Sequence, residues 1–270
     1  MVIRLIDDAN EWQILFYRSL TLSLFLFFYI GFTYRGPLLR AYTAPGPGAV
    51  IAGISLGLAF ASWIFAMTHT TIANALFILS SAPFITAVLG KLILGESVKR
   101  LTIICMSVAA IGVSIMVIEG ALIGSLLGNV FALGASCGFA LFTVLLRRTR
   151  SVDMTPAVFW AGISGIIIGA TAIIFNNSTF VISHHDFEMC AIMGLVQVGI
   201  GLIIYIAGSK YVPAAELALL SLIEVMLGPI WVWLGVGEIP SFYTMVGGAV
   251  ILSAIAFQAI AGIRNNRIIV

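Results

Sequence analysis

Long apolar runs, each about the length needed to cross a bilayer, dominate this chain. Charged residues, Gly and Pro bound the runs and mark the expected ends of membrane helices. A spanning helix needs about 20 predominantly apolar residues. On this basis the sequence predicts about nine membrane helices, at residues 12–33, 48–68, 71–93, 101–118, 123–147, 155–175, 188–209, 213–236 and 241–263. The expected fold class is an all-α polytopic membrane protein.

Composition agrees with this pattern and excludes several classes of function. Hydrophobic residues make up 61% of the chain and charged residues only 9%, whereas soluble domains carry about 25% charged residues. The net charge is +2, and the basic residues lie in short connections, so no face suits nucleic acid. No GxxxxGK[ST] nucleotide loop occurs, and the three Cys residues lack metal-type or paired spacing. We expect no cofactor and no metal; the expected partners are the lipid bilayer and a small-molecule solute.

Lys and Arg residues predict the orientation, because short cytoplasmic loops hold an excess of them. Ten of the thirteen basic residues fall in alternate connections or at the C-terminal end, on one side: Arg35, Arg40, Lys99, Arg100, Arg147, Arg148, Arg150, Lys210, Arg264 and Arg267. The C-terminus is therefore predicted to be cytoplasmic, and nine spans would place the N-terminus outside. The expected location is a bacterial inner (plasma) membrane.

An internal repeat emerges when the sequence is shifted against itself by 142 residues. The shift aligns Gly57 with Gly199, Trp63 with Tyr205, Ala73 with Ala215, Leu92 with Leu234, and Gly95-Glu96 with Gly237-Glu238. The two copies end on opposite sides of the membrane, as inverted repeats of secondary transporters do. We assign residues 1–120 to a first repeat of about four helices and residues 121–270 to a second of five. The first half thus lacks its opening helix.

Four segments carry a resemblance to a known family: FYRSL (16–20), ANALFILSSAPFITAVLGKLILGES (73–97), GNVFALGASCGFALFTVLLRR (128–148) and LLSLIEVMLGPIWVWLGVGE (219–238). With these segments the chain resembles the EamA-type branch of the drug/metabolite transporter superfamily, typically ten helices in two inverted five-helix halves. The resemblance implies export of a small organic metabolite, such as an amino acid or a related amphipathic compound. The chain departs from the family in its missing first helix and in Val225, where Pro often follows the acidic residue.

Ionisable residues inside membrane spans are costly and mark candidate transport sites. Glu224, with Ser221 one turn earlier, is the first candidate; it would bind a substrate amine or carry a proton, or else serve as a structural acid. Glu216 lies in the first turn after Pro213, where an acid favours a helix N-terminus. Asn74 is the counterpart of Glu216 in the repeat and either faces the cavity or bonds a neighbouring helix.

Four further side chains are candidates for lining a solute cavity. Arg18 could fix a carboxylate, although extension to the outer interface is the cheaper arrangement for it. Trp63 and Tyr205, matched by the repeat, suit aromatic cavity walls, and Gln197 is a similar candidate. Aromatic residues in membrane helices are more often packing residues or interface anchors.

Two prolines and the histidines complete the set of candidates. Pro83 and Pro229 interrupt predicted helices in the two halves, and such breaks point to transport sites. His69 and the pair His184-His185 fall in short outer connections and are interpreted as solvated loop residues rather than a metal or pH-sensing site.

The sequence thus predicts a secondary transporter that works by alternating access around a cavity near the membrane midplane. Proton coupling through Glu224 and uncoupled flux both remain open, as does the oligomeric state. Two other classes are a non-transporting membrane scaffold or subunit, and an intramembrane enzyme. The enzyme would need clustered His, Asp, Ser or Cys on facing helices, and no His falls in the middle of a predicted span.

Overall fold

The structure is a computed structural model of the chain. It describes residues 5–34, 38–43, 46–70, 72–117, 126–149, 151–223, 227, 233–234 and 241–266. Within these ranges the regular elements are all helical. The helices are α1 Glu11–Thr33, α2 Leu38–Thr43, α3 Pro47–His69, α4 Ile72–Leu79, α5 Ala82–Leu94, α6 Arg100–Val117, α7 Leu126–Arg148, α8 Thr155–Phe175, α9 His184–Ile192, the π-helix η2 Met193–Ile200, α10 Gly201–Ser209, α11 Ala214–Ser221 and α13 Phe242–Asn266.

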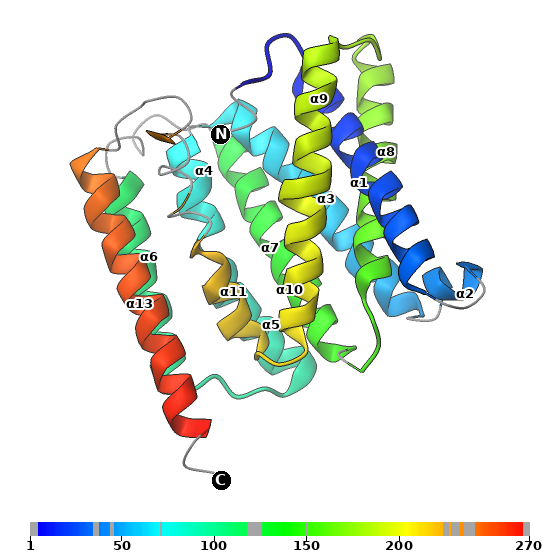
Figure 1. Ribbon diagram of the computed structural model, residues 1–270. Helices are drawn as coiled ribbons and strands as arrows, with labels where there is room; N and C mark the ends of the chain where they lie inside the picture. The colour runs from blue at the N-terminus through cyan, green and yellow to red at the C-terminus, as the bar shows by residue number, and fades with distance from the viewer. Residues whose placement is uncertain are drawn as a thin grey trace.

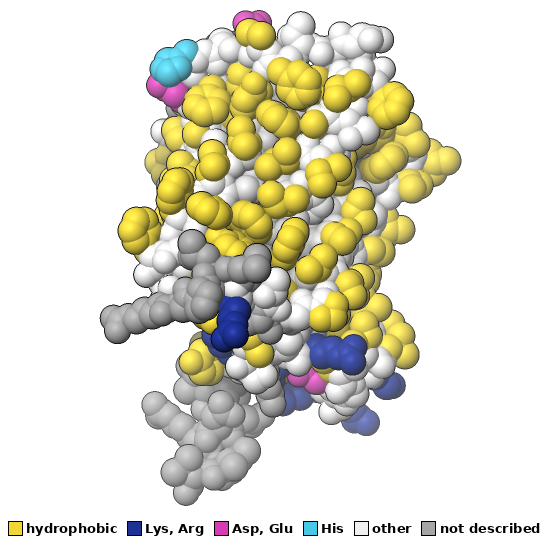
Figure 2. Space-filling model, turned by 90° about the vertical axis from the view of Figure 1, so that its right-hand side faces the viewer, with side chains coloured by type: hydrophobic (Ala, Val, Ile, Leu, Met, Phe, Trp, Pro, Cys, Tyr) yellow, Lys and Arg dark blue, Asp and Glu magenta, His cyan; other side chains and the backbone are white. Residues whose placement is uncertain are grey.

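The helices have the length and surface of membrane spans. In the described part of the chain, six helical segments are long and apolar enough to cross a bilayer. Large side chains such as Phe32 and Phe175 are more than four-fifths exposed, which suits contact with lipid. Figure 2 shows hydrophobic side chains over the middle of the molecule, with Lys and Arg gathered at one end and His at the other. The chain is therefore a polytopic, integral membrane protein, as predicted.

We call the end that carries Arg147, Arg148, Lys99 and Lys210 the basic end. The helices run between this end and the opposite end, where α9 begins at His184 (Figure 1). Most helix bounds fall within a few residues of the predicted spans. The span predicted for 213–236 is described continuously only to residue 223, so the total of nine remains a prediction.

Two predicted spans differ from single α-helices in an informative way. The span predicted for 71–93 is two helices, α4 and α5, separated at Ser80-Ser81. The span predicted for 188–209 begins earlier, at His184, because the Ser183 hydroxyl accepts the Asp186 backbone N–H at 3.0 Å and caps the helix. Its central eight residues form the π-helix η2.

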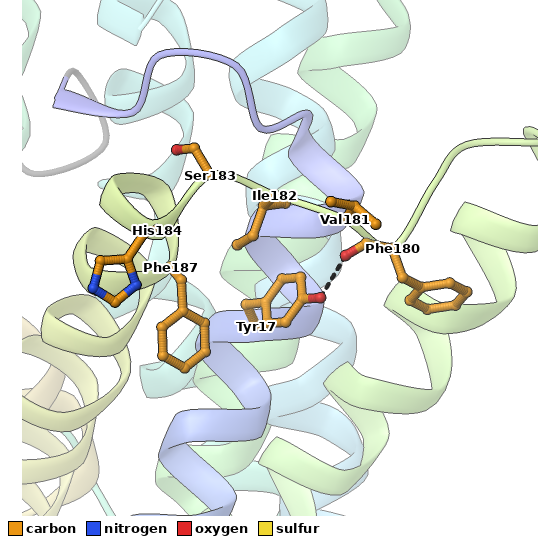
Figure 3. Close-up of a pocket in the computed structure, with 7 residues that line it drawn as sticks. All are labelled: Tyr17, Phe180, Val181, Ile182, Ser183, His184 and Phe187. Carbon is orange, nitrogen blue, oxygen red and sulfur yellow. Dashed lines mark hydrogen bonds between the residues drawn. The ribbon is translucent and has the colours of Figure 1, made fainter.

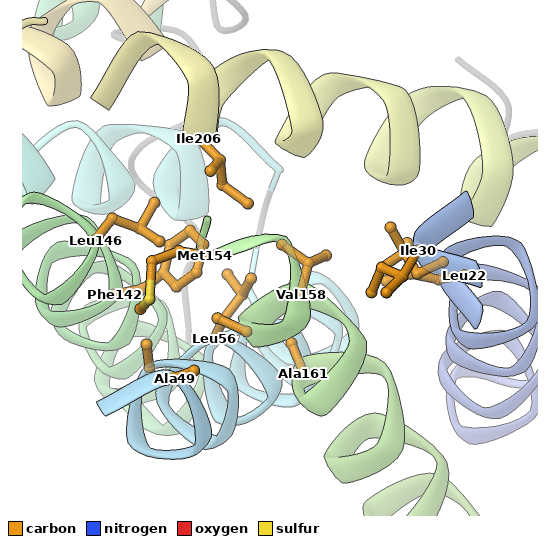
Figure 4. Packing of buried hydrophobic residues seen from close by; sticks show 13 residues of the cluster. Leu22, Ile30, Ala49, Leu56, Phe142, Leu146, Met154, Val158, Ala161 and Ile206 are labelled. Carbon is orange, nitrogen blue, oxygen red and sulfur yellow. The ribbon is translucent and has the colours of Figure 1, made fainter. Parts of the chain in front are cut away.

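The helices pack in two groups that follow the two main apolar clusters. Helices α1, α3, α7, α8 and α10 share the first cluster, whose side chains are drawn in Figure 4 and include Leu22, Leu56, Phe142 and Val158. Helices α6 and α13 lie side by side and share the second cluster with α11 (Figure 1). Close approach relies on glycine: a Cβ on Gly53 would lie 2.5 Å from the Ala157 carbonyl oxygen, so α3 and α8 touch there through backbone.

Candidate functional site

The break between α4 and α5 is the first feature that a transport site could use. Pro83 lies in the first turn of α5 and has no N–H, so the Leu79 carbonyl loses its usual helical partner. On the neighbouring helix α7, the buried Ser136 hydroxyl donates to the Ile78 carbonyl at 3.1 Å. By the rise of an α-helix, Ser80 lies roughly 12 Å from the start of α4. The break thus lies well inside the span, directly before Pro83.

A cavity of about 470 Å³ opens at this break. Helices α4, α5, α6 and α7 and the break between α4 and α5 line it through Phe77, Ile78, Ser80, Ser81, Phe84, Ala110, Asn129, Val130 and Leu133. Its walls are mostly apolar. Small-molecule sites commonly combine such walls with a few fixed polar groups.

The polar groups of this cavity are neutral. The Ser80 hydroxyl donates to the Phe77 carbonyl at 2.6 Å, whereas the buried Ser81 hydroxyl has no hydrogen-bond partner in the described structure. Asn129 Oδ1 accepts a hydrogen bond from the Thr70 hydroxyl at 3.1 Å. An unpaired buried hydroxyl is unfavourable, and a solute with a donor or acceptor would satisfy it. The cavity suits a small amphipathic solute.

At the basic end, an ion pair holds four helix ends together. Arg147 Nε lies 3.0 Å from Glu96 Oε1, and the Arg147 side chain is only 10% exposed. Arg147 Nη1 also donates to the carbonyls of Ser209 at 3.3 Å and Lys210 at 2.9 Å, at the end of α10. Glu96 Oε2 accepts the Ala214 N–H at 3.4 Å, at the start of α11. We call Glu96 and Arg147 the basic-end ion pair.

A second contact lies one helical turn further into the molecule. The hydroxyls of Thr143 on α7 and Tyr205 on α10 share a hydrogen bond of 2.8 Å. Tyr205 also packs against Phe139, with ring centroids 5.4 Å apart. Phe139, Thr143 and Arg147 follow one another at four-residue spacing and therefore lie on the same face of α7. Helices α7 and α10 are thus closed against each other over two turns.

A second pocket, of about 510 Å³, lies at the opposite end between α1 and α9 (Figure 3). Tyr17 of α1 and Phe187 of α9 line it below the connection from α8, and the Tyr17 hydroxyl donates to the Phe180 carbonyl. The adjacent Asp186 is fully buried, and its carboxylate accepts the backbone N–H groups of Asp7, Asp8 and Ala9 at 3.0 to 3.2 Å. His184 and His185 are exposed, in keeping with their interpretation as solvated residues, but they begin helix α9 rather than lie in a loop, and the neighbouring Asp186 anchors the N-terminal residues.

Several predicted site residues have other surroundings. Glu224 and Pro229 lie outside the described residues, as does the side chain of Asn74 on α4. The Ser221 hydroxyl donates to the Ala218 carbonyl of its own helix at 2.7 Å. Gln197 is exposed on η2.

Glu216 takes part in a polar network at the start of α11. Its Oε1 lies 3.5 Å from the Thr102 hydroxyl, which donates to it, and 3.9 Å from Lys99 Nζ. Thr102 in turn accepts a hydrogen bond from Gln258 Nε2 at 3.1 Å. These contacts join α11, α6 and α13. Glu216 also lies in the first turn of α11, where a negative charge stabilises the helix.

The two aromatic residues predicted from the repeat lie in different apolar clusters. Trp63 packs beside Ile78 and Phe131, between α3, α4 and α7, on the cluster next to the cavity. Tyr205 contacts α7 nearer the basic end. Arg18 was predicted to extend its guanidinium to the outer membrane interface, the arrangement with the lower energetic cost. It is instead buried, with 6% of its surface exposed.

Sequence reasoning missed Ser80, Ser81, Glu96 and Arg147. The serines had a usable signal, since SerSer directly precedes AlaPro inside an otherwise apolar span. Glu96 and Arg147 belong to segments that carry the family resemblance, but they are 51 residues apart and nothing in their local sequence pairs them.

Comparison with known proteins agrees with this architecture. A curated relative, the pseudopaline exporter CntI of Pseudomonas aeruginosa PAO1, is 22% identical over 217 residues, covering 77% of this chain and 73% of the relative. The exporter of the same name from strain UCBPP-PA14 matches to the same extent. One solved crystal structure superposes with a TM-score of 0.76 at 16% identity, over 95% of this chain and 90% of that chain, and shares the fold. The model of the EamA-like transporter family matches residues 1–118 and 126–259, and the chain belongs to this family.

Proposed function

We propose that the chain is a secondary transporter that exports a small amphipathic organic solute, such as an amino acid or a related compound, through the cavity at the α4–α5 break. The observation that carries this proposal is a solute-sized cavity with neutral polar groups at a helix break deep within a span. Broken helices supply transporter sites because their free backbone groups can bind the solute. The relatives named as exporters support the direction of transport.

Alternating access is supported by the closure at the basic end. The basic-end ion pair and the Thr143–Tyr205 hydrogen bond close α7 against α10, while the cavity lies nearer the opposite end. In a transport cycle these contacts would open as the cavity closes. We place the basic end and the C-terminus in the cytoplasm of a bacterial cell, following the predominance of Lys and Arg there.

An inverted repeat is supported by the helix bounds. A shift of 142 residues carries α4, Ile72–Leu79, onto α11, Ala214–Ser221. The same shift relates α1 to α8 and α6 to α13, and each of these helices packs against its own counterpart. The family model also matches the chain twice. Helix α4 begins at the opposite end and α11 at the basic end, as inversion requires. The scaffold and enzyme alternatives have no comparable support.

Blocking the cavity tests the proposal. Leu133 lines the cavity from α7, and Leu133→Trp would place a bulky ring against the solute. We expect proteoliposomes loaded with a mixture of amino acids to release at least one solute faster than protein-free vesicles. Leu133→Trp should slow this release about tenfold or more, because the larger side chain obstructs the solute. Release is measured by mass spectrometry of the external medium.

The matched control is Ile167→Trp, which changes a 60% exposed side chain on α8 away from the cavity. It should release solute at the native rate. Native protein that releases none of the solutes would argue against transport. Equal release from Leu133→Trp and native protein would show instead that the solute takes another path.

Proton coupling through Glu224 is a separate part of the proposal. An acid in the span that takes up a proton as the solute leaves would make efflux depend on a pH gradient. We expect the native protein to release solute several-fold faster with a gradient than without one, and Glu224→Gln to lose that dependence, since an amide does not titrate. The same vesicle assay measures both. Gradient-independent release by the native protein would mean an uncoupled facilitator.

A further inference from the structure

Arg18 is a buried cation that has no ion-pair partner in the described part of the chain. It lies seven residues after the start of α1, roughly 10 Å into the helix, and is 6% exposed. None of the ion pairs found among the described residues includes it. Its Nη2 atom is buried and has no hydrogen-bond partner. A buried charge is costly unless an anion pairs with it, so this guanidinium is incomplete as it stands.

The surroundings of Arg18 leave the edge of the guanidinium, rather than its face, for a ligand. The Arg18 Cζ atom lies 4.7 Å from the centre of the Phe60 ring on α3. A cation–π contact of this kind occupies one face of the planar group. The unpaired Nη2 donors point within the plane, which is the direction from which a carboxylate forms two parallel hydrogen bonds. A planar carboxylate therefore matches the part of Arg18 that remains unsatisfied.

Besides α1 and α3, the π-helix η2 surrounds Arg18. Helix η2 packs directly on the turn of α1 that holds Arg18: a Cβ on Gly194 would lie 2.5 Å from the Arg18 carbonyl oxygen and 2.2 Å from Thr21 Oγ1. Segments of π-helix are rare and occur frequently at functional sites. The pocket of Figure 3 lies elsewhere on α1, where Tyr17, the residue next to Arg18, lines it together with the connection from α8 and the start of α9.

We propose that Arg18 forms a carboxylate-binding site between α1, α3 and η2, separate from the cavity at the α4–α5 break. The carboxylate of a small organic acid would accept hydrogen bonds from the guanidinium edge, with Phe60 against the guanidinium face. Binding at this site does not depend on transport. Under this proposal, the protein recognises small organic acids through the Arg18 site.

Binding of benzoate and benzamide to the purified protein in nanodiscs tests the site. The two probes have nearly the same shape and differ in carrying a carboxylate or a neutral amide. We expect benzoate to raise the unfolding temperature in a saturable manner and benzamide, chloride and phosphate to have no such effect. Arg18→Gln should weaken benzoate binding about tenfold or more, because a charged hydrogen-bonded pair is lost. The matched control, Lys91→Gln, removes an exposed charge from α5 and should bind as the native protein does.

Arg18→Lys keeps the experiment decisive should Arg18→Gln fail to fold. Lys retains the charge but not the planar fork, so benzoate binding should weaken several-fold and still exceed benzamide binding. The proposal is overturned when benzoate stabilises the native protein no more than benzamide or chloride does. Native-strength benzoate binding by Arg18→Gln, or by Arg18→Lys where only that variant folds, overturns it as well. Either result leaves the transport proposal to its own assay.

Discussion

Replacing Glu96 by Gln is expected to open the basic end of the protein. Arg147 would then keep its hydrogen bonds to the carbonyls of Ser209 and Lys210 but lose its only counterion among the described residues. Breaking a fully buried ion pair costs about 3–5 kcal/mol. Since the Glu96 side chain is 30% exposed, we expect about 1.4 to 2.8 kcal/mol, which shifts the equilibrium toward the open form roughly tenfold to hundredfold.

The rate of thiol labelling at Ser209 measures this opening. Ser209 is 2% exposed, so Ser209→Cys should react with a membrane-impermeant maleimide only when α10 separates from α7. The three native Cys residues are replaced in the background protein. Glu96→Gln and Arg147→Gln should each accelerate labelling, whereas Arg148→Gln, which removes the exposed neighbouring charge, should not.

A double-mutant cycle isolates the ion pair itself. In the Glu96→Gln background, Arg147→Gln should change the labelling rate less than it does in the native protein, because the pair is already broken. Fully additive effects of the two changes would mean that the residues act independently. Unchanged labelling in both single variants would mean that this ion pair does not hold the basic end closed.

The apolar spans were predictable because few backbone conformations are stable inside a bilayer. Backbone polar groups in lipid must be satisfied internally, so a run of about 20 apolar residues reads as a helix with little ambiguity. Pro83 marked the break between α4 and α5 for a similar local reason, since it cannot donate to the helix that contains it. In both cases the information lies within one segment of sequence.

Features that depend on two distant segments were not predictable in this way. Asp186 is buried against the backbone of residues 7–9, which lies more than 170 positions earlier in the sequence. The π-helix η2 lies in a nearly uniform apolar run, MGLVQVGI, where hydrophobic periodicity distinguishes poorly between helix types. Arg18 is placed by its contact with Phe60 on another helix. The free-energy cost of burying a charge favoured placing Arg18 at the membrane interface, because the sequence alone does not reveal the contact with Phe60.

Asp186→Asn is expected to release the N-terminal segment from the start of α9. The native carboxylate uses both oxygens: Oδ1 accepts from Asp7, and Oδ2 accepts from Asp8 and Ala9. An amide keeps one oxygen and places a donor where the other stood, so it faces at least one backbone N–H with no acceptor. With hydrogen bonds to charged groups contributing about 1.5–3 kcal/mol each, we expect a loss of roughly 2–4 kcal/mol in local stability.

Hydrogen exchange of the amides of residues 7–9 reports this loss directly, because exchange rates follow the free energy of local opening. Asp186→Asn should accelerate exchange of these amides by roughly thirtyfold or more, the factor that corresponds to about 2 kcal/mol. Glu188→Gln is the matched control: Glu188 lies two residues further along α9, and its half-exposed side chain pairs with the exposed His184 at 3.2 Å. Exchange in that variant should stay at the native rate, since an exposed pair contributes little. Equal exchange in both variants would mean that the helix start is held by its other contacts, chiefly that of His185 with the Leu5 carbonyl at 2.9 Å, and that the buried carboxylate is dispensable.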